Sequence, residues 1–359
     1  MVRASFLALQ EPGHSPGQRY RVEAFEPLLE ARGIAVRTDA ILRPAELRSF
    51  YRGSAAAKAA VSAKALYRRL ASLAQTPAPD VWLVQREAFF LGDAWAERLA
   101  SRRAPVVYDF DDAIWIRAMS AANSRYAWLK NVDKIARVVA LADTVIAGNA
   151  YLAEWASQHS ARVRIIPTCV DTAHFTPVRE RSPGPVVIGW SGSPSTIEHL
   201  RPLLPVLERL KARYRDRLQV RVMGDPSFHH APLALDGERW TPEAELALLR
   251  RMDIGVMPLP DDPWTRGKCA LKGLVSMAVG AATVMSPVGV NRAIVRDGVN
   301  GFLPASDDQW LQVLSRLVDD ADLRATIGAA GRRTVEDDYS VTRWAPALAE
   351  ALLAAAGRA

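Results

Sequence analysis

Short runs of apolar residues alternate with helical segments along the whole chain. An unbroken apolar run between two helices is typical of a strand buried on both faces of a parallel sheet. In the first half, such runs predict strands over residues 4–10, 34–42, 80–85, 105–109, 143–147 and 163–166. Helical periodicity lies between them, including residues 18–32 and 126–141. This half is therefore predicted to be an α/β domain.

The pattern is interrupted at residues 171–185 and then starts again. This stretch contains Pro177, Pro183, Gly184 and Pro185 among charged residues, which is typical of a linker. Beyond it we predict strands over 186–190, 218–223, 254–257 and 282–285, with helices over 196–214, 242–251, 271–279, 307–318, 323–333 and 341–355. The chain is thus predicted to form two α/β domains, residues 1–178 and 184–338.

Composition excludes several other classes of protein. A chain of 359 residues with 49% hydrophobic and 24% charged residues is neither disordered, coiled-coil nor collagen-like. Cys169 and Cys269 lack the number and spacing of a disulfide scaffold or a metal site, and they fit a reducing compartment. The apolar run at residues 4–9 is too short for a signal peptide, and no run approaches the ~18 residues of a membrane span. We therefore expect a cytoplasmic protein.

The net charge of +7 raises the question of an anionic partner. Arg supplies 39 of the 46 cations, and Ala is abundant, so coding bias toward G and C is an alternative cause. Nucleic-acid binding fits the charge, but the sequence carries no known nucleic-acid module, and we expect no such partner. The location of the cations has to decide between these interpretations.

Loops after the predicted strands are the places to look for chemistry, because ligands bind at the carboxyl ends of parallel strands. Residues 13–21 follow the first strand and hold His14, Gly17, Arg19 and Tyr20. Glycines there permit close backbone approach, and a helix N-terminus favours an anion, although a plain turn is the alternative. The chain lacks the GxGxxG dinucleotide fingerprint, which disfavours a dehydrogenase.

Three carboxylates, Asp109, Asp111 and Asp112, follow the strand at 105–109. Such a cluster can bind a metal, act as a base or accept hydrogen bonds from sugar hydroxyls. One of them could instead cap the next helix. Because like charges at this spacing need a partner, a functional role is favoured.

Three loops of the second domain have the composition of a phosphate site. Ser191, Gly192 and Ser193 lie in a small-residue loop that precedes a predicted helix. Arg266, Lys268 and Lys272 are expected at the start of a helix, where cations oppose the helix dipole, so a diphosphate ligand is favoured over helix stability. A solvated basic edge is the alternative. The third loop contains Gly289 and Val290, whose backbone can approach a phosphate or a sugar.

These loops, in this order, resemble the bacterial GT4-type glycosyltransferases, which have the GT-B fold. The resemblance spans nearly the whole chain from Pro16, and it is carried by residues 107–115, 166–171, 187–194, 253–259, 272–278, 287–291 and 298–302. It implies two facing Rossmann-like domains with the active site in the cleft between them. It also implies that the final helix, residues 341–356, returns to the first domain.

The resemblance further implies transfer of a sugar from a UDP- or GDP-linked donor with retention at the anomeric carbon, in cell-surface polysaccharide biosynthesis. The second domain would bind the donor through residues 191–193, Arg266, Lys268, Lys272, Gly289 and Val290. The first would bind a glycan or lipid-linked acceptor through His14, Gly17, Arg19 and Tyr20. Asp109, Asp111, Asp112, Arg266 and Lys268 would be catalytic. Such enzymes are generally metal-independent, so we expect neither a metal nor a further cofactor.

One departure from the family keeps two alternatives open. The family often has two Glu residues that contact the donor sugar and the ribose, and Gly267 and Val275 stand at those positions here. A rearranged donor site is one interpretation of this difference. Weakened or lost activity is the other. A non-catalytic nucleotide-sugar-binding protein and a GT-B nucleotide-sugar epimerase are separate alternatives for the function.

Residues 43–69 carry seven cations and a single acidic residue, Glu46. The aromatic residues Phe50, Tyr51 and Tyr67 are interleaved with them. This pattern favours contact with an anionic lipid surface or with a lipid-diphosphate acceptor, at the inner face of the cell membrane. A solvated helical surface is the alternative.

Overall fold

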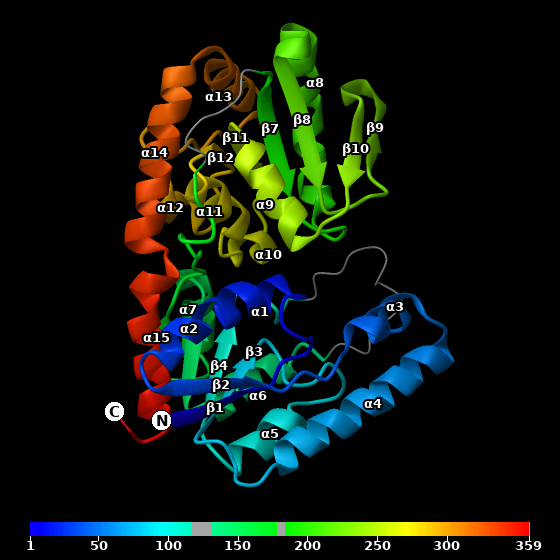
Figure 1. The fold of residues 1–359 in the computed structure, drawn as a ribbon, viewed down its shortest axis with the longest axis vertical. Helices are drawn as coiled ribbons and strands as arrows, with labels where there is room; N and C mark the ends of the chain where they lie inside the picture. Colours follow the sequence, from blue (N-terminus) through cyan, green and yellow to red (C-terminus); the bar gives the residue numbers. More distant parts are fainter. Residues whose placement is uncertain (117–130, 178–183, 359) are drawn as a thin grey trace. The chain divides into compact units, whose positions relative to one another are not determined.

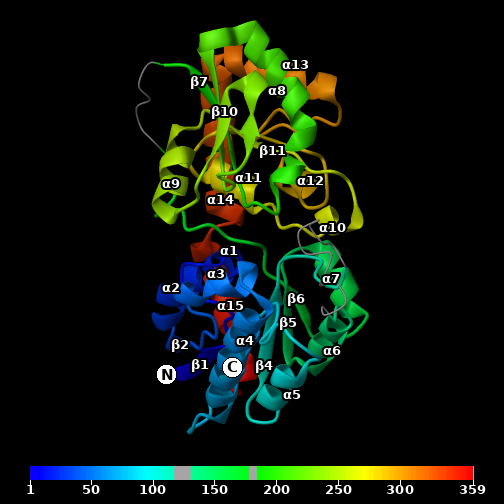
Figure 2. The same cartoon turned by 90° about the vertical axis from the view of Figure 1, so that its right-hand side faces the viewer.

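Every apolar run that we predicted as a strand pairs with parallel neighbours in one of two six-stranded sheets (Figures 1 and 2). The computed structural model describes residues 1–116, 131–177 and 184–358. The chain divides into two compact units, residues 1–168 with 344–359, and residues 169–343. The predicted α/β fold class is confirmed by these two parallel sheets.

The first unit is built on the sheet order β2-β1-β3-β4-β5-β6, with all neighbouring strands parallel. Its strands are β1 (Val2–Phe6), β2 (Ile34–Thr38), β3 (Val81–Gln85), β4 (Val106–Phe110), β5 (Thr144–Ala147) and β6 (Val163–Ile165). Its helices are α1 (Pro16–Arg21), α2 (Glu26–Glu30), α3 (Pro44–Arg52), α4 (Ala55–Ala74), α5 (Trp95–Ser101), α6 (Lys134–Leu141), α7 (Ala150–Ser157) and most of α15 (Val341–Ala355).

The second unit has the sheet order β12-β11-β7-β8-β10-β9, in which only the pair β9–β10 is antiparallel. Its strands are β7 (Val186–Ser191), β8 (Leu218–Met223), β9 (His229–His230), β10 (Leu235–Glu238), β11 (Ile254–Met257) and β12 (Ala282–Met285). Its helices are α8 (Leu204–Tyr214), α9 (Pro242–Arg251), α10 (Pro263–Arg266), α11 (Leu271–Ala278), α12 (Asn291–Ile294), α13 (Asp307–Asp319) and α14 (Ala321–Asp338).

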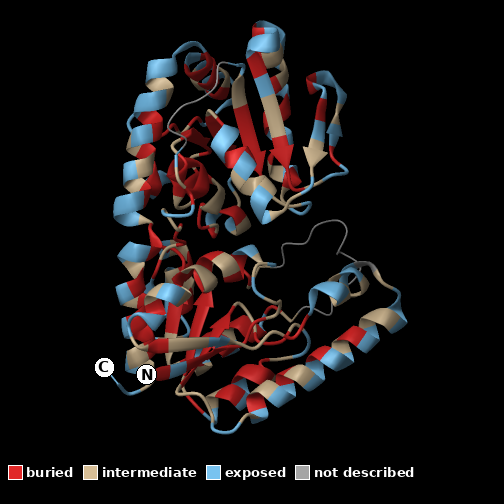
Figure 3. Cartoon of the chain, viewed as in Figure 1, coloured by how far each residue is buried: buried red, intermediate tan, exposed pale blue. Residues whose placement is uncertain are grey.

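Buried residues concentrate on the sheets and on the inward sides of the helices (Figure 3). Trp82 and Tyr108 are fully buried side chains of the first unit. In the second unit, Trp190 lies in a core cluster with residues of β8, α8 and α13. Each unit thus buries its own sheet, as the unbroken apolar strands require.

Proline accounts for two corrections to the predicted helices. The helix predicted over 18–32 is divided into α1, a 3₁₀ turn at Glu23–Phe25 and α2, which has Pro27 in its first turn. The helix predicted over 196–214 begins as two 3₁₀ turns, and α8 starts only at Leu204. Proline lacks the N–H that a continuous helix needs, and it is tolerated in a first turn.

Other differences concern the ends of elements. The strand predicted over 34–42 ends at Thr38, and only a bridge between Gln10 and Leu42 continues the pairing. The short β9–β10 hairpin was not predicted. The helix predicted over 126–141 is seen as α6, while residues 126–130 lie outside the described residues, as do residues 178–183 of the predicted linker.

The division into units falls at Thr168, earlier than the sequence boundary at residue 178. Residues 169–177 pack on α14: Val170 forms a bridge with Ser340, and the Arg332 guanidinium donates 2.8 Å to the Thr172 carbonyl. These contacts join the end of the predicted first domain to the second unit. The pairing was invisible in the sequence because its partners lie far apart in the chain.

Candidate functional site

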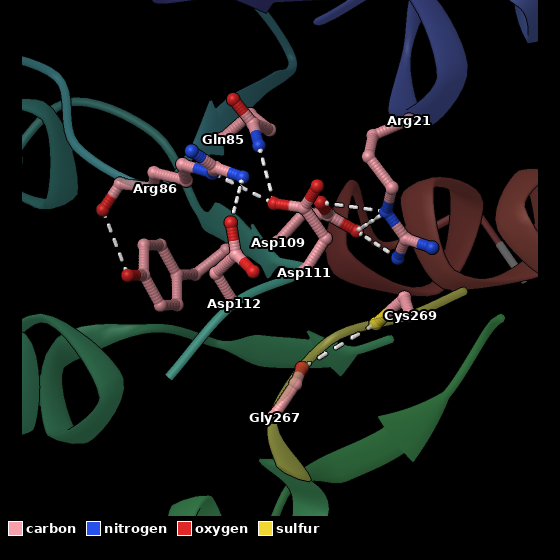
Figure 4. Close-up of polar contacts among 9 residues, drawn as sticks. Arg21, Gln85, Arg86, Asp109, Asp111, Asp112, Gly267 and Cys269 are labelled. Atoms are coloured by element: carbon pink, nitrogen blue, oxygen red, sulfur yellow. Dashed lines mark hydrogen bonds and ion pairs between the residues drawn. The ribbon is translucent and has the colours of Figure 1, made fainter. Parts of the chain in front are cut away.

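The first of the three carboxylates, Asp109, lies inside strand β4 and is buried (Figure 4). Arg21, also buried, donates from Nε to both Asp109 oxygens at 3.0 and 3.2 Å. Arg21 donates in addition to the Ile166 carbonyl at 2.8 Å. Burial raises the pKa of Asp109, and the charge of Arg21 and its hydrogen bonds oppose that shift. Asp109 is therefore held inside the unit as one half of an ion pair.

Asp111 and Asp112 share a different partner, Arg86, which directly follows β3 (Figure 4). Arg86 Nε lies 2.7 Å from Asp111 Oδ1, and its Nη2 lies 2.6 Å from Asp112 Oδ2. Gln85 Nε2 adds a hydrogen bond of 3.1 Å to Asp111. The side chains of Asp111 and Asp112 stay 15% and 17% exposed, so these two carboxylates remain within reach of solvent.

Arg86 is fixed by its backbone as well as by its side chain. Its φ of 63° lies in the left-handed region, which non-glycine residues seldom occupy. Its amide donates 2.8 Å to the Asp109 carbonyl, and its own carbonyl accepts 2.7 Å from the Tyr108 hydroxyl. Strain of this kind persists only where the surroundings enforce it. The local fold therefore aims Arg86 at the two carboxylates.

The predicted acceptor residues separate into packing residues and surface residues. A Cβ on Gly17 would lie 2.7 Å from Gln85 Nε2, so the glycine lets α1 approach β3. Tyr20 is buried, and the Arg19 guanidinium lies 5.3 Å from its ring centroid. His14 is exposed, with Nδ1 3.0 Å from the Pro12 carbonyl. His14 and Arg19 are thus the members of this set that reach the surface.

In the second unit, the small-residue loop after β7 uses its amides internally. The Gly192 amide donates 3.0 Å to the Met223 carbonyl, and the Ser193 amide donates 2.9 Å to Thr196 Oγ1. The Ser191 hydroxyl donates 3.0 Å to Glu245. The predicted use of the Gly192 amide for a phosphate is wrong in this geometry, because β8 already accepts that hydrogen bond.

The sequence predicted that the three cations after β11 lie together at the start of one helix. In the structure they lie on separate elements. Arg266 ends the short α10, where a cation suits the helix dipole, and it forms a 2.6 Å ion pair with Asp261, whose pKa that hydrogen bond lowers. Lys268 lies between helices, so it cannot share a helix face with Lys272. Lys272 is in the first turn of α11, with Nζ 4.8 Å from the Trp190 ring centroid.

Gly289 brings the loop after β12 against the cationic loop. A Cβ on Gly289 would lie 2.6 Å from the Arg266 carbonyl oxygen, and its φ of 52° is left-handed. Among the hydrogen bonds within residues 1–116, 131–177 and 184–358, none has the amide of Gly289 or of Val290 as its donor. Arg266 and Lys272 thus both follow β11, and Gly289 follows β12, the strand next to β11 in the sheet. Lys272 also reaches Trp190 of β7, the neighbour of β11 on its other side.

A cavity of about 400 Å³ opens beside these loops. It is lined by residues 258–261 after β11, residues 286–288 after β12, and Trp310 of α13. A larger hollow of about 1110 Å³ lies elsewhere in the unit and includes Val186, Gln219 and Asp253, at the amino ends of their strands. The smaller cavity is the better candidate for a ligand, because parallel sheets bind ligands at the carboxyl ends.

Sequence reasoning missed Arg21 and Arg86, the partners of the carboxylates. Arg86 is the first residue after a predicted strand, and the strand order places it beside the loop after β4. That position was the available signal for it. Among the described residues, no group of His, Cys, Asp and Glu side chains has the arrangement of a metal site. In the same part of the chain, no helix combines the length and the apolar character needed to cross a bilayer.

Comparison with known proteins gives matches in sequence and in fold. Residues 185–320 match the family model of the glycosyl transferases group 1. D-inositol 3-phosphate glycosyltransferase from Geodermatophilus obscurus is 31% identical over 203 residues, covering 48% of this chain and 44% of that relative. The match therefore spans less than half the length of that protein.

Two solved structures show the same fold over nearly the whole chain. Sucrose-phosphate synthase from Thermosynechococcus elongatus has a TM-score of 0.70 at 14% identity, covering 98% of both chains. HepE from Anabaena, in complex with UDP and glucose, has a TM-score of 0.65 at 16% identity, covering 98% of this chain and 99% of its own. The two-sheet architecture is thus the GT-B fold.

Proposed function

We propose, from the premise that this chain belongs to the group 1 glycosyltransferases with a GT-B fold, that it is a retaining sugar transferase. The donor is a UDP- or GDP-linked sugar, and the acceptor is a hydroxyl of a glycan or of a lipid-linked glycan. The observation that carries this proposal is the close approach of the Arg266 and Gly289 loops, which follow the adjacent strands β11 and β12. Lys272 follows β11 as well and reaches Trp190 of the next strand, β7.

In the proposed reaction, the bond between the anomeric carbon and the donor phosphate oxygen breaks, and the acceptor oxygen bonds to the same carbon. The proton of the acceptor hydroxyl moves to the departing phosphate oxygen. Arg266, Lys268 and Lys272 neutralise the charge that develops on the diphosphate, which is where fixed cations lower a barrier most. The amides of Gly289 and Val290 add backbone donors to the same group.

The structure supports a division of labour among the carboxylates. Asp111 and Asp112 remain partly exposed, and we propose that they orient a hydroxyl of the acceptor or the sugar. Asp109 was expected to be catalytic, but its carboxylate is occupied by Arg21 inside the unit. We therefore propose a positioning role for Asp109. His14 and Arg19 remain the surface candidates for acceptor contact.

The donor site differs from the family pattern at Gly267 and Val275, where the family often has Glu. Gly267, which caps α10, has no side chain, and Val275 is a buried apolar residue of α11. Neither residue therefore supplies a carboxylate to a ribose or a sugar. We propose that the sugar and ribose are held instead by the backbone and polar groups of the surrounding loops. In this proposal, the cations supply the donor affinity that the two Glu residues of the family would otherwise supply.

Transfer assays with a panel of UDP- and GDP-sugars test this proposal. We expect one donor to be turned over, and the double variant Arg266→Ala/Lys268→Ala to lose about 100-fold or more in kcat/KM, roughly 3 kcal/mol of transition-state stabilisation. Arg209→Ala, which removes an exposed cation on α8, is the matched control and should be silent. Unchanged turnover in the double variant would overturn the assignment.

Two other activities remain distinguishable by the same assay. A non-catalytic binding protein would be stabilised by a nucleotide sugar without any transfer or hydrolysis of it. An epimerase would release a sugar changed at C2 and transfer none. We propose the cytoplasmic face of a membrane as the place of action, in cell-surface polysaccharide synthesis, with residues 43–69 facing anionic lipid.

A further inference from the structure

The helix α4 exposes an apolar face to solvent along its whole length. Its buried residues are Val61, Ala65, Arg69 and Leu73, spaced by four. On the other sides, Tyr67 is 74% exposed, Leu70 44% and Leu66 40%, and exposed alanines extend the surface: Ala56, Ala59, Ala60, Ala63, Ala71 and Ala74. A surface helix of a globular protein ordinarily presents polar residues there. This face therefore has the composition of a contact surface.

Arginines that we had counted as surface charge fix the helix in place instead. Arg69 is fully buried and donates to the carbonyls of Ala8, Asp39 and Ala88 at 2.6, 3.1 and 2.8 Å. Burial lowers the pKa of Arg69 to about 10. Arg68 holds α4 to α3 through both oxygens of Glu46. The prediction that all seven cations of residues 43–69 form an outward basic surface is therefore wrong for these two.

The charges that remain outside are all positive. α4 contains no Asp or Glu, and Glu46, the one acid of α3, is taken up by Arg68. Lys64 is exposed on α4 itself, while Arg43, the N-cap residue of α3, and Arg48 are exposed on the helix that Arg68 ties to α4. Such an apolar strip, which has cations beside it and no acidic residues, is complementary to a partner with an apolar interior and an anionic surface.

The size of the strip decides between two occupants. Twenty residues of helix at 1.5 Å per residue give a length of about 30 Å, and a strip about 10 Å wide covers roughly 300 Å². A stable protein interface buries about 800 Å² on each partner. Two copies of α4 facing each other would also bring like charges together. A second copy of the chain therefore fits poorly.

We infer that the outer face of α4, centred on Tyr67 and carrying Lys64, docks on an anionic lipid surface together with the exposed Arg48 of the neighbouring α3. Leu66, Tyr67 and Leu70 enter the headgroup region, while the cations stay at the level of the lipid phosphates. This inference extends the proposed function, since a lipid-linked acceptor is presented at such a surface. It narrows the contact from the whole basic segment to one face of one helix.

Co-sedimentation of the full chain with vesicles tests the inference. Binding is expected to vesicles of equal parts phosphatidylcholine and phosphatidylglycerol, to weaken with salt, and to be at least tenfold weaker to phosphatidylcholine alone. Tyr67→Glu should reduce binding to the anionic vesicles by at least tenfold. Val299→Glu, at a side chain that is 50% exposed in the second unit, is the matched control and should leave binding unchanged.

Several outcomes would overturn the inference. Vesicle binding that ignores lipid charge, or that survives both Tyr67→Glu and Leu70→Gln, would do so. Self-association that Tyr67→Glu abolishes would assign the face to a dimer instead. Nucleotide-induced thermal stabilisation reports on the donor site alone and should survive Tyr67→Glu. Loss of vesicle binding with that stabilisation intact therefore separates the membrane inference from the proposed transferase function.

Discussion

Two arginines compensate the charge of the carboxylate cluster in the first unit. Asp109, Asp111 and Asp112 are crowded on one strand end, and like charges at this spacing repel. Arg21 takes one carboxylate and Arg86 takes the other two. The first pair is buried and the second is partly exposed, so the two arginines should differ in what their removal costs.

Removing Arg21 tests the buried pair. Arg21→Met leaves the Asp109 carboxylate buried without its partner, which should destabilise the protein by about 3–5 kcal/mol in urea unfolding. The double variant Arg21→Met/Asp109→Asn removes that uncompensated charge and should recover part of the loss. A single variant within about 1 kcal/mol of the parent would contradict a structural role for the pair.

Gly289 offers a second test at this scale, with a matched control. Gly289→Ala places a Cβ 2.6 Å from the Arg266 carbonyl oxygen at a φ of 52°, so the two loops must separate. We expect at least tenfold weaker nucleotide binding by calorimetry, together with a lower Tm. Gly298→Ala has a φ of 73° but open space around its Cβ, so it should lose about 1 kcal/mol of stability and keep its affinity. Equal affinities in the two variants would argue against this loop contact.

Among the secondary-structure elements, α3 and α4 show how the first unit orients an apolar helix face. Glu46 accepts 2.6 and 2.8 Å hydrogen bonds from Arg68, and it also accepts from the Arg43 amide at the start of α3. The hydrogen bond from Arg68 is the main reason that the pKa of Glu46 is lowered to about 2. One carboxylate thus caps one helix and ties it to the next.

The low pKa of Glu46 gives a prediction with a definite sign. Because its folded pKa lies below the ordinary value of 4.5, its stabilising effect is full above that value and is lost as the pH falls toward 2. Glu46→Gln should reduce the free energy of unfolding at neutral pH by about 1 kcal/mol and so lower the Tm. The variant should also lose less stability than the parent as the pH falls toward 2. Thermal unfolding followed by circular dichroism across that range measures both effects. A parallel decline in parent and variant would exclude Glu46 as a contributor.

For the whole molecule, the candidate site residues fall into two sets, with cations and a cavity in the second unit and carboxylates in the first. The division follows the chain contacts rather than the linker, since residues 169–177 belong with α14. Each unit offers the carboxyl ends of its own sheet. A donor nucleotide should therefore act on the second unit by itself.

Hydrogen exchange with and without UDP or GDP tests this separation. The nucleotide that binds should protect residues 258–270 and 286–291, around Arg266 and Gly289, while the amides of the first unit exchange unchanged. At about 100 times the Kd, the same nucleotide should add about 2.7 kcal/mol of stability. Protection confined to residues 13–21 and 109–112 would place the nucleotide in the wrong unit.

The predictable part of the site was the set of loops, and the unpredictable part was the set of partners. Asp111, Arg266 and Gly289 could be located because they follow strands that the apolar runs predict. The role of the Gly192 amide was misjudged, since its acceptor, Met223, lies on a neighbouring strand. The helix face shared by Lys268 and Lys272 was misjudged because α11 begins only at Leu271.

The sequence by itself determined the two parallel sheets and the loops that can carry chemistry, because strand and helix periodicity are local properties of the chain. Only the tertiary structure decided which charges are used internally. Arg21 meets Asp109 from 88 positions away, and Arg69 meets the Ala8 carbonyl from 61 positions away. Such pairings depend on how strands are ordered in a sheet, and that order is settled by packing over the whole unit. For this reason, only the folded chain shows which of the residues behind the net charge of +7 lie on the surface.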